Sequence, residues 1–496
     1  MENPRYRKKE DILPKEKAKI AIVGGGVAGA SAALYFGQLG LDVTLFEKES
    51  SLVSGPPFCH LHAGGNLYRE ISDVQCVTLL KQSIDFLRFY PFIVDYRPTV
   101  IVLPNSDSGT PEALFPRLAL LTREYEALIA QDTDNKVLGE SENYYKSYDR
   151  AEIEALKQQA LVKTPKSCDE WMIPVARNID LDKVQFPLIM VQEYGLNLFR
   201  LAAGAALTLE NLDSVTLHTN SIVHNVQKNC NDTGWVLSYL KDELSHEESF
   251  DYLINAAGFR TGKIDDMLGA PCKAMVEFKA AYVSRWDESD DIRFPEIIFH
   301  GERGTPRGMG QFTPYPNGYF QLHGMTKGIT LYEDGLVANT AVSCQPKLGQ
   351  NFIEKIEKSW TKEETSERTN SAIRHLSQFI PAFKTAHVGS KPLFGAQQIP
   401  GDDPTLRVAE VSFPRERYAR CEIVKVSSVL DMIDAITKQL IDLGYVEVDM
   451  LGKRDFADVA KLNESAIKKR AESIAKKREY PASLANRTVT APKEMV

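Results

Sequence analysis

Residues 19–30, KIAIVGGGVAGA, decide the fold, because an apolar run leads into a GxGxxG motif and then into a helix of small residues. In a dinucleotide-binding βαβ unit each glycine of this motif has its own task. Gly24 makes the tight turn, Gly26 lets the backbone approach a pyrophosphate, and Gly29 lets the helix lie against the strand. The amides at the N-terminus of the helix then face the phosphates.

A second apolar strand is expected at residues 41–46, LDVTLF, and it ends on Glu47. This acid lies about 20 residues beyond the glycines, where a carboxylate binds the hydroxyls of a ribose. A GxGxxG motif alone is weak evidence. The order of strand, turn, helix, strand and acid predicts a dinucleotide site.

The sequence shows no second motif of this kind after a strand. The nearest candidate, residues 301–310 with the sequence GERGTPRGMG, has the wrong spacing and a proline at the point where a helix would begin. An enzyme that reduces a flavin with a nicotinamide usually has a second nucleotide fold. We therefore expect the substrate to reduce the cofactor directly.

Composition narrows the function further. The chain has 496 residues, and 59 Lys and Arg against 67 Asp and Glu give a net charge of −8, which argues against nucleic acid as a partner. The seven cysteines are scattered without a CxxC pair, a pattern of reduced thiols in a cytoplasmic-type compartment. His60 and His62 are the one close pair among nine histidines, so we expect no metal site.

Residues 1–17 are polar, and no stretch approaches 18 apolar residues, so neither a signal peptide nor a membrane span is expected.

The rest of the chain alternates between strand and helix patterns. Residues 255–258, NAAG, close one predicted strand with small residues that permit a ligand or a helix to approach. The predicted strands are 214–223, 235–239, 252–254, 278–286, 296–300 and 319–323, and the predicted helices are 113–129, 150–159, 351–379 and 429–443.

The C-terminal part differs in composition. Residues 453–478 are rich in Lys, Ala and Glu with interspersed apolar residues, so a helix is expected. Its basic runs, 468–470 and 476–478, form either a solvated helix face or a peripheral contact with an anionic membrane surface. The residues from Tyr480 onward are expected to be loosely ordered.

Two segments carry a family resemblance. Residues 19–49, KIAIVGGGVAGASAALYFGQLGLDVTLFEKE, and residues 250–262, FDYLINAAGFRTG, together resemble flavoprotein oxidoreductases of the D-amino-acid oxidase type. This group includes glycine oxidases, sarcosine oxidases and, more distantly, malate:quinone oxidoreductases. The resemblance covers about residues 16–75, 195–265 and 310–440, and it implies FAD as the cofactor without specifying the substrate.

The resemblance implies an α/β fold, α+β overall, with a Rossmann-like FAD-binding domain built from discontinuous segments. A substrate domain with a large antiparallel sheet accompanies it. The expected segments are 16–80, 191–268 and 386–446 for the FAD-binding domain, 81–190 for an inserted helical part of the substrate domain, 269–385 for its antiparallel sheet, and 447–496 for a basic helical tail.

The expected cofactor-binding residues come from the motifs and from the resemblance. Residues 50–68 form a loop of small and polar residues just past Glu47, and in the family this loop runs under the isoalloxazine ring. The full set is Gly24, Gly26, Val27, Ala28, Gly29, Glu47, Lys48, His62, Ala63, Gly64, Val223, Ala256, Ala257, Gly258, Lys425, Ser427 and Ser428.

Residues 420–428, RCEIVKVSS, depart from the family pattern, which has a glycine-rich turn before its last flavin-contacting helix. A helix capped by Ser427 or Ser428 can still stabilise the reduced pyrimidine edge of a flavin, with Lys425 adding charge.

Flavin-dependent dehydrogenation removes a hydride from carbon, and a base is needed where the substrate carries a hydroxyl. His60, His62 and His323 are the candidate bases, because an imidazole titrates near neutral pH. Family substrates usually carry a carboxylate, which calls for an arginine and often a tyrosine hydroxyl. The candidates are Arg303, Arg307 and Tyr319, and Tyr319 shares a strand face with His323 because the two residues are four apart.

The sequence therefore predicts a cytoplasmic FAD-dependent oxidoreductase that oxidises a small amino or 2-hydroxy acid and passes the electrons to oxygen or a quinone. Two alternatives stay open. A flavin-dependent monooxygenase or halogenase would need NAD(P)H and a GD motif, whose letters occur at residues 401–402 without a clear preceding strand. A non-catalytic FAD-binding assembly protein is the other alternative, and the irregular segment 420–428 is its best indication.

Overall fold

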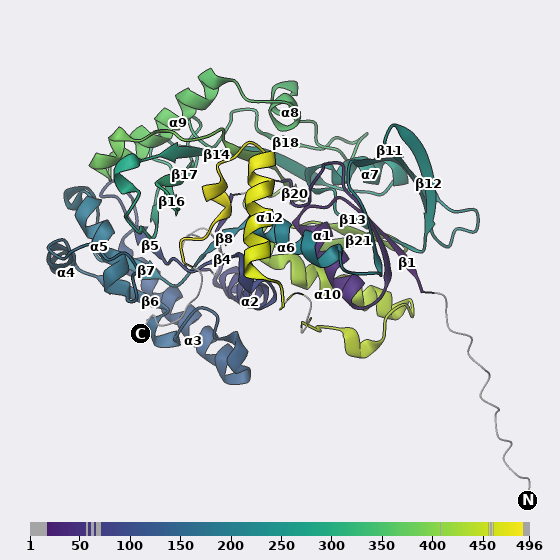
Figure 1. The fold of residues 1–496 in the computed structure, drawn as a ribbon, viewed down its shortest axis with the longest axis horizontal. Coiled ribbons are helices and arrows are strands. Elements are labelled where there is room, and N and C mark those ends of the chain that lie inside the picture. The colour runs from purple at the N-terminus through teal and green to yellow at the C-terminus, as the bar shows by residue number, and fades with distance from the viewer. Residues whose placement is uncertain are drawn as a thin grey trace, which may run out of the picture.

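A six-stranded sheet is built around the glycine motif and lies on the right of the molecule in Figure 1. The computed structural model describes residues 17–55, 58–60, 64–65, 71–406, 408–454, 456, 459 and 461–489. The strand order is β21-β22-β13-β1-β2-β9; β21 pairs antiparallel to β22, and the other pairs are parallel. The strands are β1 (Lys19–Val23), β2 (Asp42–Phe46), β9 (Val215–His218), β13 (Tyr252–Asn255), β21 (Val411–Arg415) and β22 (Tyr418–Cys421).

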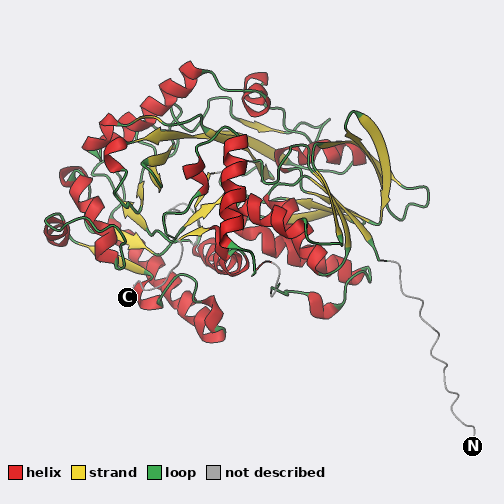
Figure 2. Ribbon diagram, in the orientation of Figure 1, coloured by secondary structure: helices red, strands yellow, loops and turns green. Residues whose placement is uncertain are grey.

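Alternating side chains of β1 are buried on opposite faces of this sheet. Ile20 and Ile22 pack into the cluster formed with the helices, whereas Ala21 and Val23 pack against a second, three-stranded sheet. Figure 2 shows the helices gathered on one side of the sheet. The helices of that layer are α1 (Val27–Gln38), α2 (Asp73–Phe89), α6 (Leu198–Leu209) and α10 (Val429–Asp442), and the second sheet consists of β10 (Ser221–Lys228), β11 (Trp235–Lys241) and β12 (Leu244–Phe250).

A ten-stranded sheet forms the other half of the molecule. Its order is β18-β14-β17-β16-β15-β5-β7-β6, with β19 and β20 also paired to β14, and β15 with β5 is a parallel pair in an otherwise antiparallel sheet. Its strands are β5 (Thr99–Val102), β6 (Tyr145–Tyr148), β7 (Leu188–Val191), β14 (Ala274–Arg285), β15 (Glu296–Phe299), β16 (Gly310–Tyr315), β17 (Tyr319–Gly324), β18 (Leu336–Ala338), β19 (His387–Val388) and β20 (Leu393–Pro400).

The two faces of this large sheet differ in polarity. Phe312, Phe320 and Leu322 are buried with Leu376 of helix α9 (Lys362–Ser377). The opposite face of the same strands carries polar side chains, which follows from the alternation YFQLHG in β17. The large sheet therefore has one face that packs in a hydrophobic core and one face that carries polar side chains.

Several shorter elements complete the described fold. They are β3 (Phe58–His60), β4 (Val94–Asp95) and β8 (Gly195–Asn197) in a small sheet, and the helices α3 (Phe115–Gln131), α4 (Arg150–Leu156), α5 (Cys168–Asn178), α7 (Thr261–Leu268) and α8 (Gln350–Glu357).

The C-terminal segment packs against the first half of the chain. Helix α12 (Glu464–Lys477), yellow in Figure 1, lies against α6 and buries Ile467, Ala471 and Ile474. A 3₁₀ helix, η11 (Ala482–Ala485), follows it and is mostly buried. The expectation that the chain is loosely ordered from Tyr480 is therefore wrong as far as residue 489. No helix in the described part of the chain combines the length and apolarity that a membrane crossing requires.

The predicted α/β fold class with a large antiparallel sheet is confirmed. Three element boundaries were predicted wrongly. Residues 214–223 form two strands in different sheets, because Asn220 has a positive φ of 50° and turns the chain between them. The helix expected over 351–379 is broken before Lys362, where the Thr361 side chain accepts a hydrogen bond from the Glu364 amide and starts a new helix. The tail helix begins only at Glu464.

Candidate active site

A cavity of about 1130 Å³ opens between the six-stranded sheet and the large sheet. On one side it meets Val23 and Phe46 at the carboxyl ends of β1 and β2, which is the edge where parallel α/β sheets bind ligands. On the other side it meets strands β16 and β17. A ligand that fills the cavity therefore touches both sheets.

The glycine motif is shaped by contacts that exclude side chains. Gly24 has a φ of +101°, which favours glycine, and a Cβ at Gly29 would lie 1.8 Å from the carbonyl oxygen of Gly24. Gly26 is different, because no described atom of its surroundings lies within 4 Å of its Cβ position. Gly26, Val27 and Ala28 line the cavity at the N-terminus of α1. The motif therefore leaves room for an anionic group in front of the helix amides.

Glu47 follows β2 and lines the cavity together with Lys48. Its side chain is buried, and its two carboxylate oxygens accept hydrogen bonds from the amides of Gly25 at 2.7 Å and Glu49 at 2.8 Å. Burial raises the pKa of this carboxyl, and the two backbone bonds oppose the rise. Each oxygen still has a lone pair for a ligand hydroxyl.

The middle segment of the chain reaches the same cavity. Residues 256–258 follow β13 and line the cavity, as does Val223 of β10. Asn255 holds this turn, because its buried side chain donates hydrogen bonds to the Thr261 carbonyl at 3.0 Å and to the Tyr418 hydroxyl at 2.7 Å. The structure thus brings together the glycine motif, Glu47 and the NAAG segment.

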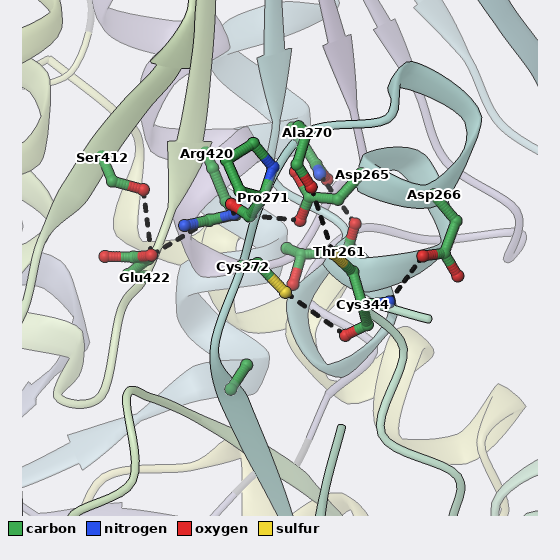
Figure 3. A network of polar contacts seen from close by, with 12 residues as sticks. Thr261, Asp265, Asp266, Ala270, Pro271, Cys272, Cys344, Ser412, Arg420 and Glu422 are labelled. Atoms are coloured by element: carbon green, nitrogen blue, oxygen red, sulfur yellow. Dashed lines mark hydrogen bonds and ion pairs between the residues drawn. The ribbon is translucent and has the colours of Figure 1, made fainter. Parts of the chain in front are cut away.

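A network of polar contacts fixes the strand that leads to residues 423–426 (Figure 3). Arg420 of β22 pairs with the buried Asp265 of α7 at 3.4 Å and with Glu422 at 3.0 Å. Ser412 of β21 donates a hydrogen bond to Glu422 at 2.9 Å. These contacts anchor β22 on both sides, and residues 423–426 then line the cavity.

Lys425 lines the cavity, but Ser427 and Ser428 are buried in the 3₁₀ helix η9 (Val426–Ser428) and are not among the described cavity walls. The Ser428 hydroxyl donates to the carbonyls of Lys425 at 2.8 Å and Ala409 at 3.2 Å and makes no capping bond to α10. The expected serine cap is therefore wrong. Its physical reason is the preceding 3₁₀ turn, which gives Ser428 a helical backbone instead of the extended backbone of an N-cap residue.

The loop after Glu47 is described only in part. His60 lies in β3, where the backbone alone is described, and His62 and Ala63 lie outside the described residues. Gly64 is buried with a φ of +96°, and the amide of Gly65 donates to the buried Glu193 at 2.7 Å.

The polar face of the large sheet forms the opposite wall. Gln311 of β16 and Gln321 and His323 of β17 line the cavity. Tyr319 shares their face of the strand but is not among the described walls, because it lies four residues, roughly 13 Å, from His323. The guanidinium of Arg285 covers its ring at 5.3 Å. The structure thus brings His323 into the site and leaves Tyr319 outside it.

Charged side chains stand beside this polar face. Lys279 of β14 lines the cavity, and its ammonium group lies 2.8 Å from Glu277. Arg303 also lines the cavity and pairs with the same Glu277. Arg307 is exposed and is not among the described walls, whereas Arg303 and Lys279 are.

Sequence reasoning missed the wall formed by residues 477–480, which lie at the end of α12 and directly beyond it. The Arg478 guanidinium donates to the Ser51 hydroxyl at 2.9 Å and to the carbonyls of Leu52 at 2.6 Å and Val53 at 2.9 Å. Burial lowers the pKa of Arg478. The Tyr480 hydroxyl donates to a carbonyl just before β20 at 2.7 Å.

The sequence contains a signal that the C-terminal segment is buried, but this signal does not identify the segment as a cavity wall. Ile467, Ala471 and Ile474 recur at helical spacing and show that the tail has a face to bury. The pattern does not say which part of the molecule covers that face.

Comparison with known proteins supports the fold. A search of curated proteins finds no match to the chain. Among solved structures the chain is similar to glycine oxidase from Geobacillus kaustophilus (13% identity, 89% of this chain and 100% of that chain, TM-score 0.50), glycerol-3-phosphate dehydrogenase from Bacillus halodurans complexed with FAD (12%, 94% and 74%, 0.54) and L-amino acid deaminase from Proteus vulgaris (13%, 93% and 98%, 0.54). At these identities the likeness concerns the fold.

The family model described as DAO, FAD dependent oxidoreductase, matches residues 19–405, most of the chain. The match confirms the resemblance to the D-amino-acid oxidase type and FAD as the cofactor. The space at Gly26 and the buried acid at Glu47 fit such a dinucleotide. The chain therefore belongs to the DAO family of FAD-dependent oxidoreductases and is an FAD-dependent enzyme.

Proposed function

We propose that this enzyme oxidises a small amino or 2-hydroxy acid and passes the electrons to oxygen or a quinone. One observation carries the proposal: the polar face of the large sheet, with His323, lines the same cavity as the glycine motif. A substrate held on that face lies next to a cofactor held by the motif. When bound, FAD supplies the acceptor for the hydride of the substrate.

The residues that hold FAD follow from the cavity walls. The amides at the start of α1 would hold the pyrophosphate, and Glu47 would accept hydrogen bonds from the adenosine ribose. Residues 256–258 and Val223 would hold the adenosine half, and Lys425 would supply a cation for the reduced flavin.

The substrate side offers partners for a carboxylate and for a proton. Arg303 and Lys279 share the carboxylate of Glu277, so an incoming substrate carboxylate can pair with a cation that is already positioned. His323 accepts the proton of a substrate hydroxyl. Gln321, which lines the cavity beside His323, supplies a hydrogen bond that orients the substrate on the sheet.

The monooxygenase alternative finds little support in the fold. Residues 401–402 do follow a strand, β20, contrary to the sequence-based expectation. However, Asp402 forms an exposed pair with Lys273 and is not among the described cavity walls. The GD letters therefore have no role at the site.

Glu47→Gln should weaken FAD binding by roughly 10- to 100-fold, because the amide nitrogen cannot accept a ribose hydroxyl and a hydrogen bond to a charged group contributes about 1.5–3 kcal/mol. The dissociation constant, measured by quenching of flavin fluorescence, tests this assignment. Asp42→Asn, at the start of the same strand, is the control and should bind FAD as the wild type does. Wild-type affinity in Glu47→Gln would remove Glu47 from the cofactor site.

Arg478→Met should raise the dissociation constant of FAD by roughly 5- to 100-fold, because three hydrogen bonds to residues 51–53 are lost from the cavity wall. Arg470 of helix α12 is the matched control, since it pairs with Glu210 at the surface at 2.7 Å. Arg470→Met should change FAD affinity by less than about 1 kcal/mol. Equal FAD affinities in the two variants would mean that the contacts of Arg478 do not support the site.

A panel of small amino acids and 2-hydroxy acids, added under anaerobic conditions, should contain a compound that bleaches the flavin absorbance stoichiometrically. NADH and NADPH should not do so rapidly, because the described sheets contain a single dinucleotide-binding edge. Rapid bleaching by either nucleotide would favour the monooxygenase alternative. Bleaching by no compound of the panel would reject small amino and 2-hydroxy acids as the substrates.

A quinone acceptor would place the enzyme at a membrane surface, and we propose the exposed lysines of α12 as the contact. Lys468, Lys469 and Lys476 are exposed on this helix. Arg470 and Arg478, in contrast, form contacts with other residues of the chain: Arg470 pairs with Glu210, and Arg478 donates to the Leu52 carbonyl. Changing the three lysines to Gln should reduce binding to anionic liposomes at low salt, since each basic residue contributes about 1 kcal/mol near such a surface. If the variant binds the liposomes as the wild type does, the lysine face of α12 is a solvated surface. The FAD content of the variant serves as the control for folding.

A further inference from the structure

A chain of buried polar side chains crosses the large sheet and ends at the cavity. Arg97, which follows β4, donates to Glu296 of β15 at 2.5 Å. Gln311 of β16 donates to the other oxygen of Glu296, also at 2.5 Å, and its own oxygen lies 3.4 Å from Nδ1 of His323 in β17. Glu296 and Gln311 are fully buried, Arg97 is 2% exposed and His323 is 9% exposed.

The orientation of Gln311 is set by what Glu296 can accept. Arg97 is a permanent cation, and the ion-paired Glu296 offers acceptor oxygens only. Gln311 must therefore turn its Nε2 group toward Glu296, and the same group donates to the Thr313 hydroxyl at 3.2 Å. The amide oxygen of Gln311 then points the other way, toward His323.

An acceptor opposite Nδ1 determines the tautomer of the imidazole. In the neutral ring one nitrogen carries the proton and the other carries the lone pair. Since the Gln311 oxygen can only accept, the proton belongs on Nδ1, and the lone pair belongs on Nε2. The amide sets this arrangement without placing a charge beside the ring.

We propose that Gln311 and Glu296 are positioning residues that hold His323 as the Nδ1–H tautomer, so that Nε2 serves as the base for a substrate hydroxyl. This inference rests on the proposed function. The O–H proton moves to Nε2, the hydrogen of the adjacent C–H bond leaves with its electron pair to the FAD, and the carbon–oxygen single bond becomes a double bond. The arrangement favours 2-hydroxy acids over amino acids, because a hydroxyl needs a base whereas a neutral amine does not.

The tautomer can be observed directly on the FAD-loaded enzyme labelled with ¹⁵N-histidine. Loss of one set of ring signals in His323→Gln identifies the residue. In the wild type the ¹⁵N shifts should show a protonated Nδ1 and an unprotonated Nε2 at a pH where the ring is neutral. In Gln311→Met the ring loses its fixed acceptor, and the Nε2–H tautomer should appear.

Thr313→Val is the matched control. It removes one contact of the same Gln311 amide but leaves the contacts with Glu296 and His323, so the tautomer should stay that of the wild type. If Gln311→Met does not fold with FAD, Glu296→Gln gives the same test, because a neutral amide at position 296 no longer dictates the orientation of Gln311. An Nε2–H ring in the wild type, or the same tautomer in the wild type and the variants, would overturn the proposal.

Kinetics give the second readout. Gln311→Met should slow flavin reduction by a 2-hydroxy acid roughly 10- to 100-fold, which is part of the ~10²–10⁴-fold effect of a positioned base. Reduction by amino acids and not by hydroxy acids would overturn the role of His323 as the base for a hydroxyl, even with the expected tautomer. Bleaching by neither class would instead reject the proposed function, while the ¹⁵N shifts would still decide the tautomer.

Discussion

The direct contact between helix α1 and the turn before it is the constraint on which the rest of the structure depends. A side chain at Gly29 would collide with the carbonyl oxygen of Gly24, so the helix can lie on the turn only because both residues are glycine. Strand β1 pairs with β2 and with β13 on its two sides. The contact that places the helix amides therefore also places Glu47 and residues 256–258 at one edge, and it defines where a dinucleotide can bind.

The large sheet is under a different constraint, since one face of its strands packs in an apolar core while the other face carries polar groups toward the cavity. Strict alternation in β17 sends Phe320 and Leu322 into the core and Gln321 and His323 toward the cavity. Polar side chains that are buried in this way need partners, because a group that loses water without a hydrogen bond costs free energy. Gln311 meets that need at His323. The same bonds that satisfy the buried groups thus also orient them.

The parts of the fold that depend on near neighbours could be predicted from the sequence. Strand, turn, helix and acid follow one another within residues 19–47, and the alternation in β17 places Tyr319 and His323 on one face of the strand without reference to distant residues. Long-range contacts could not be predicted in this way. Ser428 looks like a helix cap until the carbonyls of Lys425 and Ala409 take its hydroxyl. The apolar stripe of α12 predicts burial but not its position on α6, since periodicity identifies a face and not its partner.

That position of α12 links binding to the packing of the whole chain. Arg478 bonds to residues 51–53, immediately after the acid that ends β2, although the two segments are more than 400 residues apart in sequence. The cavity is complete only when the C-terminal segment has packed against the N-terminal one. A ligand that binds the complete cavity and not the open one stabilises the packed state by mass action. Because such coupling is reciprocal, FAD bound in the complete cavity would hold the C-terminal segment in place to the same extent that the segment would hold FAD.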